Sequence, residues 1–99
     1  MNEYQTIQLE AATGDTINVV ATVTDHRGAD ILLVSDDKYQ QFLASKSSPH
    51  HLEIAAKSTI APPSGEISIT VPRTDVWHIA YQPWAVSKVT ATRIAPQPG

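Results

Sequence analysis

The feature that most constrains this fold is an alternation of apolar and polar residues with a period of two. Residues 16–24, "TINVVATVT", repeat an apolar side chain at every second position, and residues 66–71, "EISITV", do the same. Successive side chains of a strand point to opposite faces, so both segments predict strands with one buried face. The residues expected to point into a core are Ile17, Val19, Ala21, Val23, Ile67, Ile69 and Val71.

Further segments are expected to complete a set of about seven strands. Residues 31–34, "ILLV", form a continuous apolar run, which is typical of a strand covered on both sides. Residues 4–11, "YQTIQLEA", and 51–56, "HLEIAA", are also expected as strands. The last strand, "VSKVTATRI", is expected to divide into two faces. One face holds Val86, Lys88, Thr90 and Thr92, and the other holds Ser87, Val89, Ala91 and Arg93.

Turn-forming residues separate these segments. They occur in "ATGD", "DHRGAD", "SKSSPH", "APPSG" and "QPW". The loop "DHRGAD", residues 25–30, has the length of a hairpin connection, and we expect Gly28 in it to adopt a positive φ. Short strands with such turns predict an all-β fold, an antiparallel β-sandwich of seven or eight strands with one short helix. Residues 1–95 are expected to form a single domain, and residues 96–99 a flexible tail.

The one expected helix covers residues 36–45, in "SDDKYQQFLAS". Ser35 is a favourable N-cap, and Asp36 and Asp37 suit the positive end of a helix dipole. Tyr39, Phe42 and Leu43 then recur at helical spacing. We expect this helix to plug one end of the sandwich.

Composition narrows the partners and the compartment. The chain has 99 residues, a net charge of -3 and no basic run, so no nucleic-acid polymer is expected as a partner. The beginning of the chain lacks the pattern of a signal peptide, and no apolar run is long enough to span a bilayer. Cysteine is absent, which excludes disulfides and thiol chemistry. We therefore expect a cytoplasmic or virion protein with no membrane partner.

Residues 71–86, "VPRTDVWHIAYQPWAV", contain both tryptophans. At period two, Trp77 shares a face with Ile79 and Tyr81, and we interpret it as a core residue. Trp84 follows Pro83 and therefore lies in or just after a turn. Two interpretations of Trp84 stay open at this point: a ligand or partner contact, or an aromatic ring that folds back over an edge strand.

The segments "ADILLVSDDKYQQFLAS" and "ISITVPRTDVWHIAYQPWAVSKVTATRI" resemble the GOLD-type β-sandwich and small bacterial sandwich domains of the same layout. The resemblance covers residues 17–94, and Asp75 occupies a position where the pattern usually has a turn glycine. The chain departs from secretory-pathway members, because it shows no cysteine pair, leader, coiled coil or membrane anchor. The resemblance therefore implies a fold and a non-catalytic interaction domain, but not a cargo receptor.

No motif indicates catalysis, a metal or a cofactor. His50 and His51 are adjacent, and neighbours in a strand point to opposite faces, so we interpret them as loop histidines rather than metal ligands. His78 is a lone histidine within a strand, and we interpret it as a satisfied structural residue. The nucleophile-elbow, Walker A and dinucleotide patterns are missing. We expect neither an enzyme nor a bound cofactor.

Two functional hypotheses follow. The first is a non-catalytic protein-interaction module, an accessory or virion-associated protein that binds a protein partner or itself as a homo-oligomer through an exposed strand edge or flat face. The second is a β-sandwich that binds a small ligand, such as a nucleotide, another small anion or a sugar. Its candidate binding residues are Trp84, Tyr81, Arg73 and Arg93.

Overall fold

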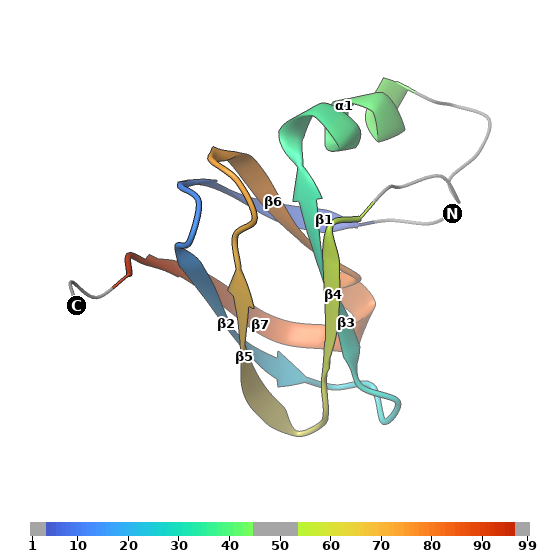
Figure 1. Cartoon of the computed structure of the whole chain (residues 1–99). Coiled ribbons are helices and arrows are strands. Elements are labelled where there is room, and N and C mark those ends of the chain that lie inside the picture. Colours follow the sequence, from blue (N-terminus) through green and yellow to red (C-terminus); the bar gives the residue numbers. More distant parts are fainter. Residues whose placement is uncertain (1–3, 45–53, 97–99) are drawn as a thin grey trace.

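The computed structural model describes residues 4–44 and 54–96, which form two facing antiparallel sheets (Figure 1). A four-stranded sheet has the order β1-β6-β3-β4, and a three-stranded sheet has the order β5-β2-β7. The strands are β1 (Gln5–Ala11), β2 (Thr16–Val23), β3 (Ala29–Ser35), β4 (Ala56–Ile60), β5 (Ser64–Thr70), β6 (Asp75–Tyr81) and β7 (Val86–Ile94). The expected all-β class, with seven strands and one α-helix in the described ranges, is confirmed.

Most connections lead from one sheet to the other. Only β3 and β4, with the helix between them, are consecutive in the chain and paired in the same sheet. The hairpin-like interpretation of "DHRGAD" is therefore wrong, because β2 pairs with β5 and β7 whereas β3 pairs with β4 and β6. The loop instead connects the two facing sheets, and we call it the β2–β3 arch. Gly28 in this arch has a positive φ of 92°, as expected.

The core fills the space between the sheets. The apolar face predicted for β2 is confirmed, since all four of its residues are buried, and Ile69 and Val71 join them. Trp77 is fully buried and is the largest side chain of this core. Other buried members are Ala11, Ala29, Ile31, Leu33, Ile60, Ile79 and Ala85.

Strand β3 is covered on both faces, as its continuous apolar run predicts. Ile31 and Leu33 point into the core between the sheets. Leu32 and Val34 point to the outer face of the four-stranded sheet, where they pack with Ala80 of β6. A second, smaller apolar cluster therefore lies outside the sandwich.

One expected face assignment is wrong at the start of β7. Val23 pairs with Val86, whereas Thr22 pairs with Lys88, so the register shifts by one residue at this point. The bulge lets Val86 pack against the core on the same side as Val89, although strict alternation would place them on opposite faces.

The expected strand at residues 51–56 is also placed wrongly. Strand β4 occupies Ala56–Ile60 instead, and residues 51–53 lie outside the described part of the chain. Ile60 supplies the anchor, because it is buried and pairs with Ala29 at the start of β3. Ile54, which the expected strand would have used, is an exposed residue before β4.

Helix α1 (Asp36–Ala44) begins where expected, and residue 45, the last of the expected range, lies outside the described part of the chain. The Ser35 hydroxyl accepts a hydrogen bond from the Lys38 backbone N–H at 3.4 Å, which is N-capping geometry. The helix does not plug the end of the sandwich. It packs against β3 and β6 (Figure 1). Tyr39 packs against the outer apolar cluster.

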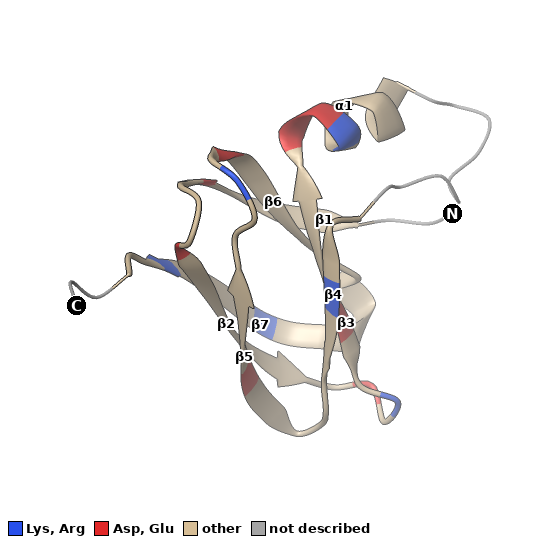
Figure 2. Ribbon diagram, in the orientation of Figure 1, with Lys and Arg blue, Asp and Glu red and all other residues tan. Residues whose placement is uncertain are grey.

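No helix in the described ranges has the length and apolar character needed to cross a membrane. Charged residues of the described chain are scattered over loops, strand ends and α1, and Lys and Arg do not gather on one face (Figure 2).

Candidate functional site

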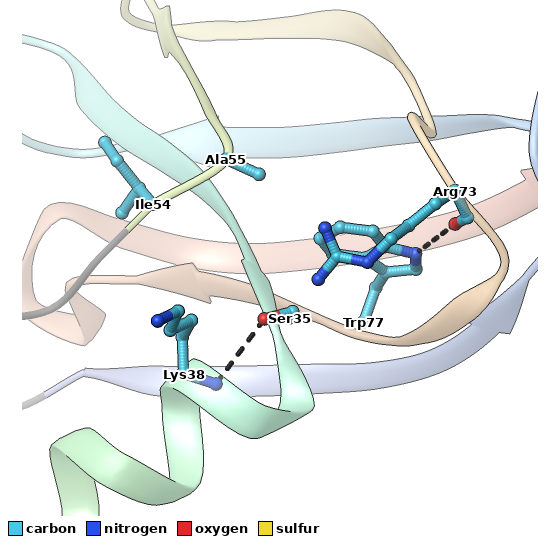
Figure 3. Close-up of a pocket in the computed structure, with 6 residues that line it drawn as sticks. All are labelled: Ser35, Lys38, Ile54, Ala55, Arg73 and Trp77. Atoms are coloured by element: carbon cyan, nitrogen blue, oxygen red, sulfur yellow. Dashed lines mark hydrogen bonds between the residues drawn. The ribbon is translucent and has the colours of Figure 1, made fainter.

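A small pocket, which we call the end pocket, opens where β3 ends and β6 begins (Figure 3). Its volume is about 180 Å³. The lining residues are Ser35, Lys38, Ile54, Ala55, Arg73 and Trp77.

Three elements, β3, α1 and β6, and two connecting segments bring these residues together. Ser35 is the last residue of β3 and pairs with Trp77 of β6. Lys38 lies in the first turn of α1. Ala55 donates a backbone hydrogen bond to Leu33 at 2.7 Å, which holds the apolar wall in place.

Arg73 comes from the connection between β5 and β6 and lies over the buried indole of Trp77. Its guanidinium carbon is 5.1 Å from the centroid of the Trp77 ring. The indole Nε1 donates a hydrogen bond of 3.1 Å to the backbone oxygen of the same arginine. One guanidinium nitrogen also lies 3.3 Å from a carboxylate oxygen of Asp75. Stacking and ion pairing thus orient a side chain that is 58% exposed.

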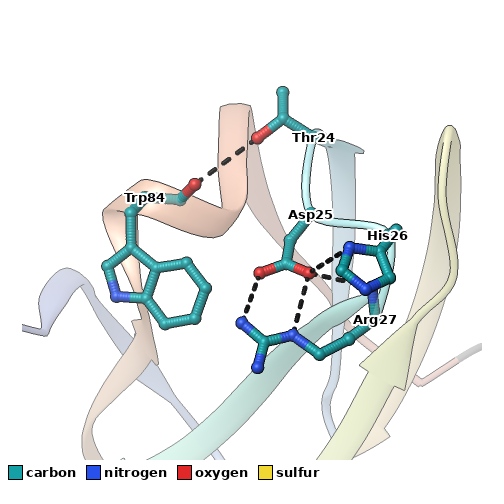
Figure 4. A network of polar contacts seen from close by, with 5 residues as sticks. All are labelled: Thr24, Asp25, His26, Arg27 and Trp84. Carbon is teal, nitrogen blue, oxygen red and sulfur yellow. Dashed lines mark hydrogen bonds and ion pairs between the residues drawn. The ribbon is translucent and has the colours of Figure 1, made fainter.

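A second group lies at the other end of β6, and we call it the Trp84 platform (Figure 4). It consists of Thr24, Asp25, His26, Arg27 and Trp84. Trp84 belongs to the 3₁₀ turn η1 (Pro83–Ala85), and its side chain is 56% exposed. The Arg27 guanidinium carbon is 5.7 Å from the centroid of the Trp84 ring.

Asp25 fixes Arg27 in this position. Its carboxylate accepts hydrogen bonds from the Arg27 backbone N–H at 2.8 Å, from Nε at 3.2 Å and from Nη2 at 3.0 Å. The Arg27 side chain, and then its backbone N–H, lower the pKa of Asp25 from 3.8 to about 2. The carboxylate therefore stays ionised and paired across the physiological range.

The four candidate binding residues do not meet. Arg73 lines the end pocket, and Trp84 lies at the opposite end of β6. The Tyr81 hydroxyl donates to Gln5 at 3.3 Å, beside a separate pocket of about 250 Å³. Arg93 lies 3.9 Å from the buried Asp15 carboxylate.

The sequence did not reveal the surroundings of two cations at these places. The pairing of Arg27 with Asp25 has a local signal, an Asp two residues before an Arg in a tight turn. Lys38 lines the same pocket as Arg73 only because α1 packs against β3 and β6, which no local pattern reveals.

His78 is buried on the outer face of the four-stranded sheet, with only 3% of it exposed. Its Nε2 lies 2.8 Å from Asp36 Oδ1, and its ring lies 4.4 Å from that of Tyr39. Its Nδ1 is buried without a hydrogen-bond partner, so the expected satisfied histidine is satisfied at one nitrogen only. The ring is closed off from solvent, which suits a structural role.

No group of three or more metal-ligating side chains gathers among residues 4–44 and 54–96. His50 and His51 lie outside these ranges.

No family model, curated protein or solved structure matches this chain. The resemblance to the GOLD-type sandwich therefore stays a prediction.

Proposed function

We propose that this chain is a non-catalytic protein-interaction module that associates with a second copy of itself through the Trp84 platform. The observation that carries the proposal is a large aromatic side chain, Trp84, which is more than half exposed on an ordered turn with an arginine beside it. Tryptophan and arginine are the residue types most enriched among energetically dominant contacts at protein interfaces.

The platform is held in place before any partner arrives. The backbone N–H groups of Thr24 and Asp25 both donate to the Ala85 oxygen, at 2.9 and 3.3 Å. The Thr24 hydroxyl lies 3.5 Å from the Trp84 oxygen. These contacts join the β2–β3 arch to η1 (Figure 4). Less conformational freedom is lost on binding when the contact residues are already ordered.

The chemistry of the platform favours a second copy as the partner. A twofold interface places the same patch on both sides, so the patch must complement itself. Arg27 supplies a cation and Trp84 supplies a π face. The arginine of one copy can therefore stack on the tryptophan of the other copy across the twofold axis. Asp25 adds the opposite charge beside them.

The size of the pockets supports a non-catalytic role. Three pockets formed by described residues have volumes of about 180, 250 and 200 Å³. Sites that enclose small-molecule substrates usually measure roughly 300–1,000 Å³. The buried ring of His78 offers no base to a dissolved substrate.

The test is the solution mass of the full chain, measured by light scattering from low-micromolar to millimolar concentration. We expect a concentration-dependent approach to the mass of a dimer. Trp84→Ala should stay a monomer over the same range, because the central contact is lost.

Ile94→Ala is the matched control, since Ile94 is another large apolar residue exposed at a strand end. It should associate as the wild type does. The near-ultraviolet signal of the buried Trp77 should show that each variant is folded. A wild type that stays monomeric at millimolar concentration, or a Trp84→Ala variant that still dimerises, would overturn the proposal.

A further inference from the structure

We propose that the end pocket is a binding site for a phosphate group, either inorganic phosphate or the phosphate of a small ester. The proposal is independent of the Trp84 platform, because the two places lie at opposite ends of β6. It rests on three features of the pocket: an arginine held in a set orientation, a second cation and a buried hydroxyl at the wall, and room for the group.

The pocket gathers positive charge from distant parts of the chain. Arg73 and Lys38 are 35 residues apart in sequence (73 minus 38), and both line the same cavity. The chain carries a net charge of -3 and only seven Lys and Arg, so two cations in one small cavity are a distinct local feature. Figure 3 shows the Arg73 guanidinium directed toward the space that Ser35, Lys38 and Ile54 border.

Arg73 is oriented before a ligand arrives. The Trp77 ring lies beneath its guanidinium, and the Trp77 Nε1 holds its backbone oxygen. A guanidinium has five N–H donors, and the ion pair with Asp75 involves one of its terminal nitrogens. The remaining donors form a planar fork that matches two oxygens of a phosphate.

Ser35 adds a hydroxyl at the wall of the pocket and is only 4% exposed. Its oxygen accepts from the Lys38 N–H, and its own proton can be donated to a ligand oxygen. A guanidinium fork and a hydroxyl together can reach three oxygens of a phosphate, one more than a carboxylate offers, and Lys38 is a further cation at the wall.

The pocket has room for a phosphate group. Its volume is about 180 Å³, and Ile54 and Ala55 form an apolar wall beside the polar side chains.

The chain contains its own pair of reporters for the test. Trp77 lines the end pocket, and its indole N–H is hydrogen-bonded to the backbone oxygen of Arg73, whereas Trp84 lies at the far end of β6. In a titration of the full chain with inorganic phosphate, followed by two-dimensional NMR, we expect the Trp77 signal to shift and saturate. The Trp84 signal should stay in place. Sodium chloride at matched ionic strength should shift neither, and sodium acetate should bind more weakly.

Variants assign the binding to these residues. Arg73→Gln should weaken phosphate binding about tenfold or more, because the guanidinium fork is lost. The phosphate affinity of Arg73→Lys should lie between those of the wild type and Arg73→Gln, since lysine keeps the charge without the planar fork. Lys88→Gln is the matched control, because it removes a cation on β7 outside the end pocket and should leave binding unchanged.

Asp75→Asn gives a test in the opposite direction. It removes the carboxylate that pairs with Arg73, while its amide oxygen can still accept the Val76 N–H that Asp75 now accepts at 2.8 Å. Phosphate should bind this variant more tightly than the wild type. An unmoved Trp77 signal, equal shifts with chloride or acetate, or unchanged affinity in a folded Arg73→Gln variant would each overturn the proposal.

Discussion

His78 Nε2 lies 2.8 Å from Asp36 Oδ1, so a buried histidine in the middle of β6 is joined to the first residue of α1. The ring of Tyr39, one turn further along the helix, packs against the same imidazole ring at a centroid distance of 4.4 Å and a tilt of 33°. None of the nine residues of α1 is fully buried. This contact is therefore a principal attachment of the helix to the sheet, and it supports the Lys38 wall of the end pocket.

A double-mutant cycle tests this attachment. Asp36→Ala should lower the urea concentration at the unfolding midpoint in the wild-type background, because the imidazole loses its carboxylate partner. In a His78→Leu background, where the imidazole is already absent, Asp36→Ala should lower the unfolding midpoint clearly less. The hydrogen bond to His78, and then that to Gln40, hold the pKa of Asp36 below its usual value, which is consistent with this coupling. Strictly additive effects would show that the two side chains do not depend on each other.

Trp77 is the most consequential core residue for stability. It is fully buried between the sheets, and it carries Arg73 on its face. Trp77→Ala should lower the free energy of unfolding by about 3–5 kcal/mol, as large-to-small changes in a core do. Trp84→Ala serves as the control and should change it by less than about 0.5 kcal/mol, since that side chain is exposed. Urea denaturation measures both, and a loss below about 1 kcal/mol for Trp77→Ala would contradict the described packing.

Much of the fold could be predicted from period-two alternation alone. The faces of β2 and β6 were predicted correctly, because each strand pairs on both sides and buries one whole face between the sheets. The failures occur where tertiary contacts override the local pattern. The bulge at the start of β7 places Val86 against the core, and β4 follows its pairing with β3 rather than its own hydrophobicity.

The candidate sites were less predictable for a similar reason. The sequence offers Trp84 and Arg73 as candidate binding residues, but their neighbours come from other parts of the chain. Arg27 reaches Trp84 only because the β2–β3 arch is hydrogen-bonded to η1. The hairpin predicted at residues 25–30 was wrong for a related reason. A short loop rich in turn residues can join two strands of one sheet or two strands of facing sheets, and the sequence of the loop does not distinguish the two.

The Asp25–Arg27 pair predicts a pH dependence of stability. The pKa of Asp25 is lowered from 3.8 to about 2 in the folded chain, chiefly by the side chain of Arg27. A lowered folded-state pKa means that the contribution is fully present above the unfolded value and is lost as the pH falls through the folded value. Asp25→Asn should therefore be less stable than the wild type near neutral pH, and the gap should narrow between pH 3.8 and about pH 2.

Thermal unfolding at a series of pH values measures this gap. Asp37→Asn is the control, because it removes a carboxylate of similar charge at the start of α1, away from Arg27. It should not reproduce the narrowing seen with Asp25→Asn. A gap between wild type and Asp25→Asn that stays constant down to about pH 2 would show that Arg27 does not hold the carboxylate ionised.

Gly14 and Gly28 both have a positive φ, and alanine substitutions at the two positions distinguish the cost of backbone strain from the cost of steric crowding. Gly14 has a φ of 88° and Gly28 a φ of 92°, so alanine is strained by a similar amount at both positions. A Cβ at Gly28 would lie 3.0 Å from the Ile60 oxygen, whereas a Cβ at Gly14 meets only a Pro96 carbon at 3.7 Å. Gly14→Ala should therefore cost about 1–2 kcal/mol of unfolding free energy, the backbone contribution alone.

Gly28→Ala should cost more than that, because the end of β4 must move away from the arch as well. Urea denaturation of the two variants side by side measures the difference. Equal losses would show that the backbone at Ile60 yields without cost, and would contradict the tight packing of the β2–β3 arch against β4. A larger loss for Gly28→Ala, together with weaker self-association, would show that the arch under the Trp84 platform owes its position to this packing.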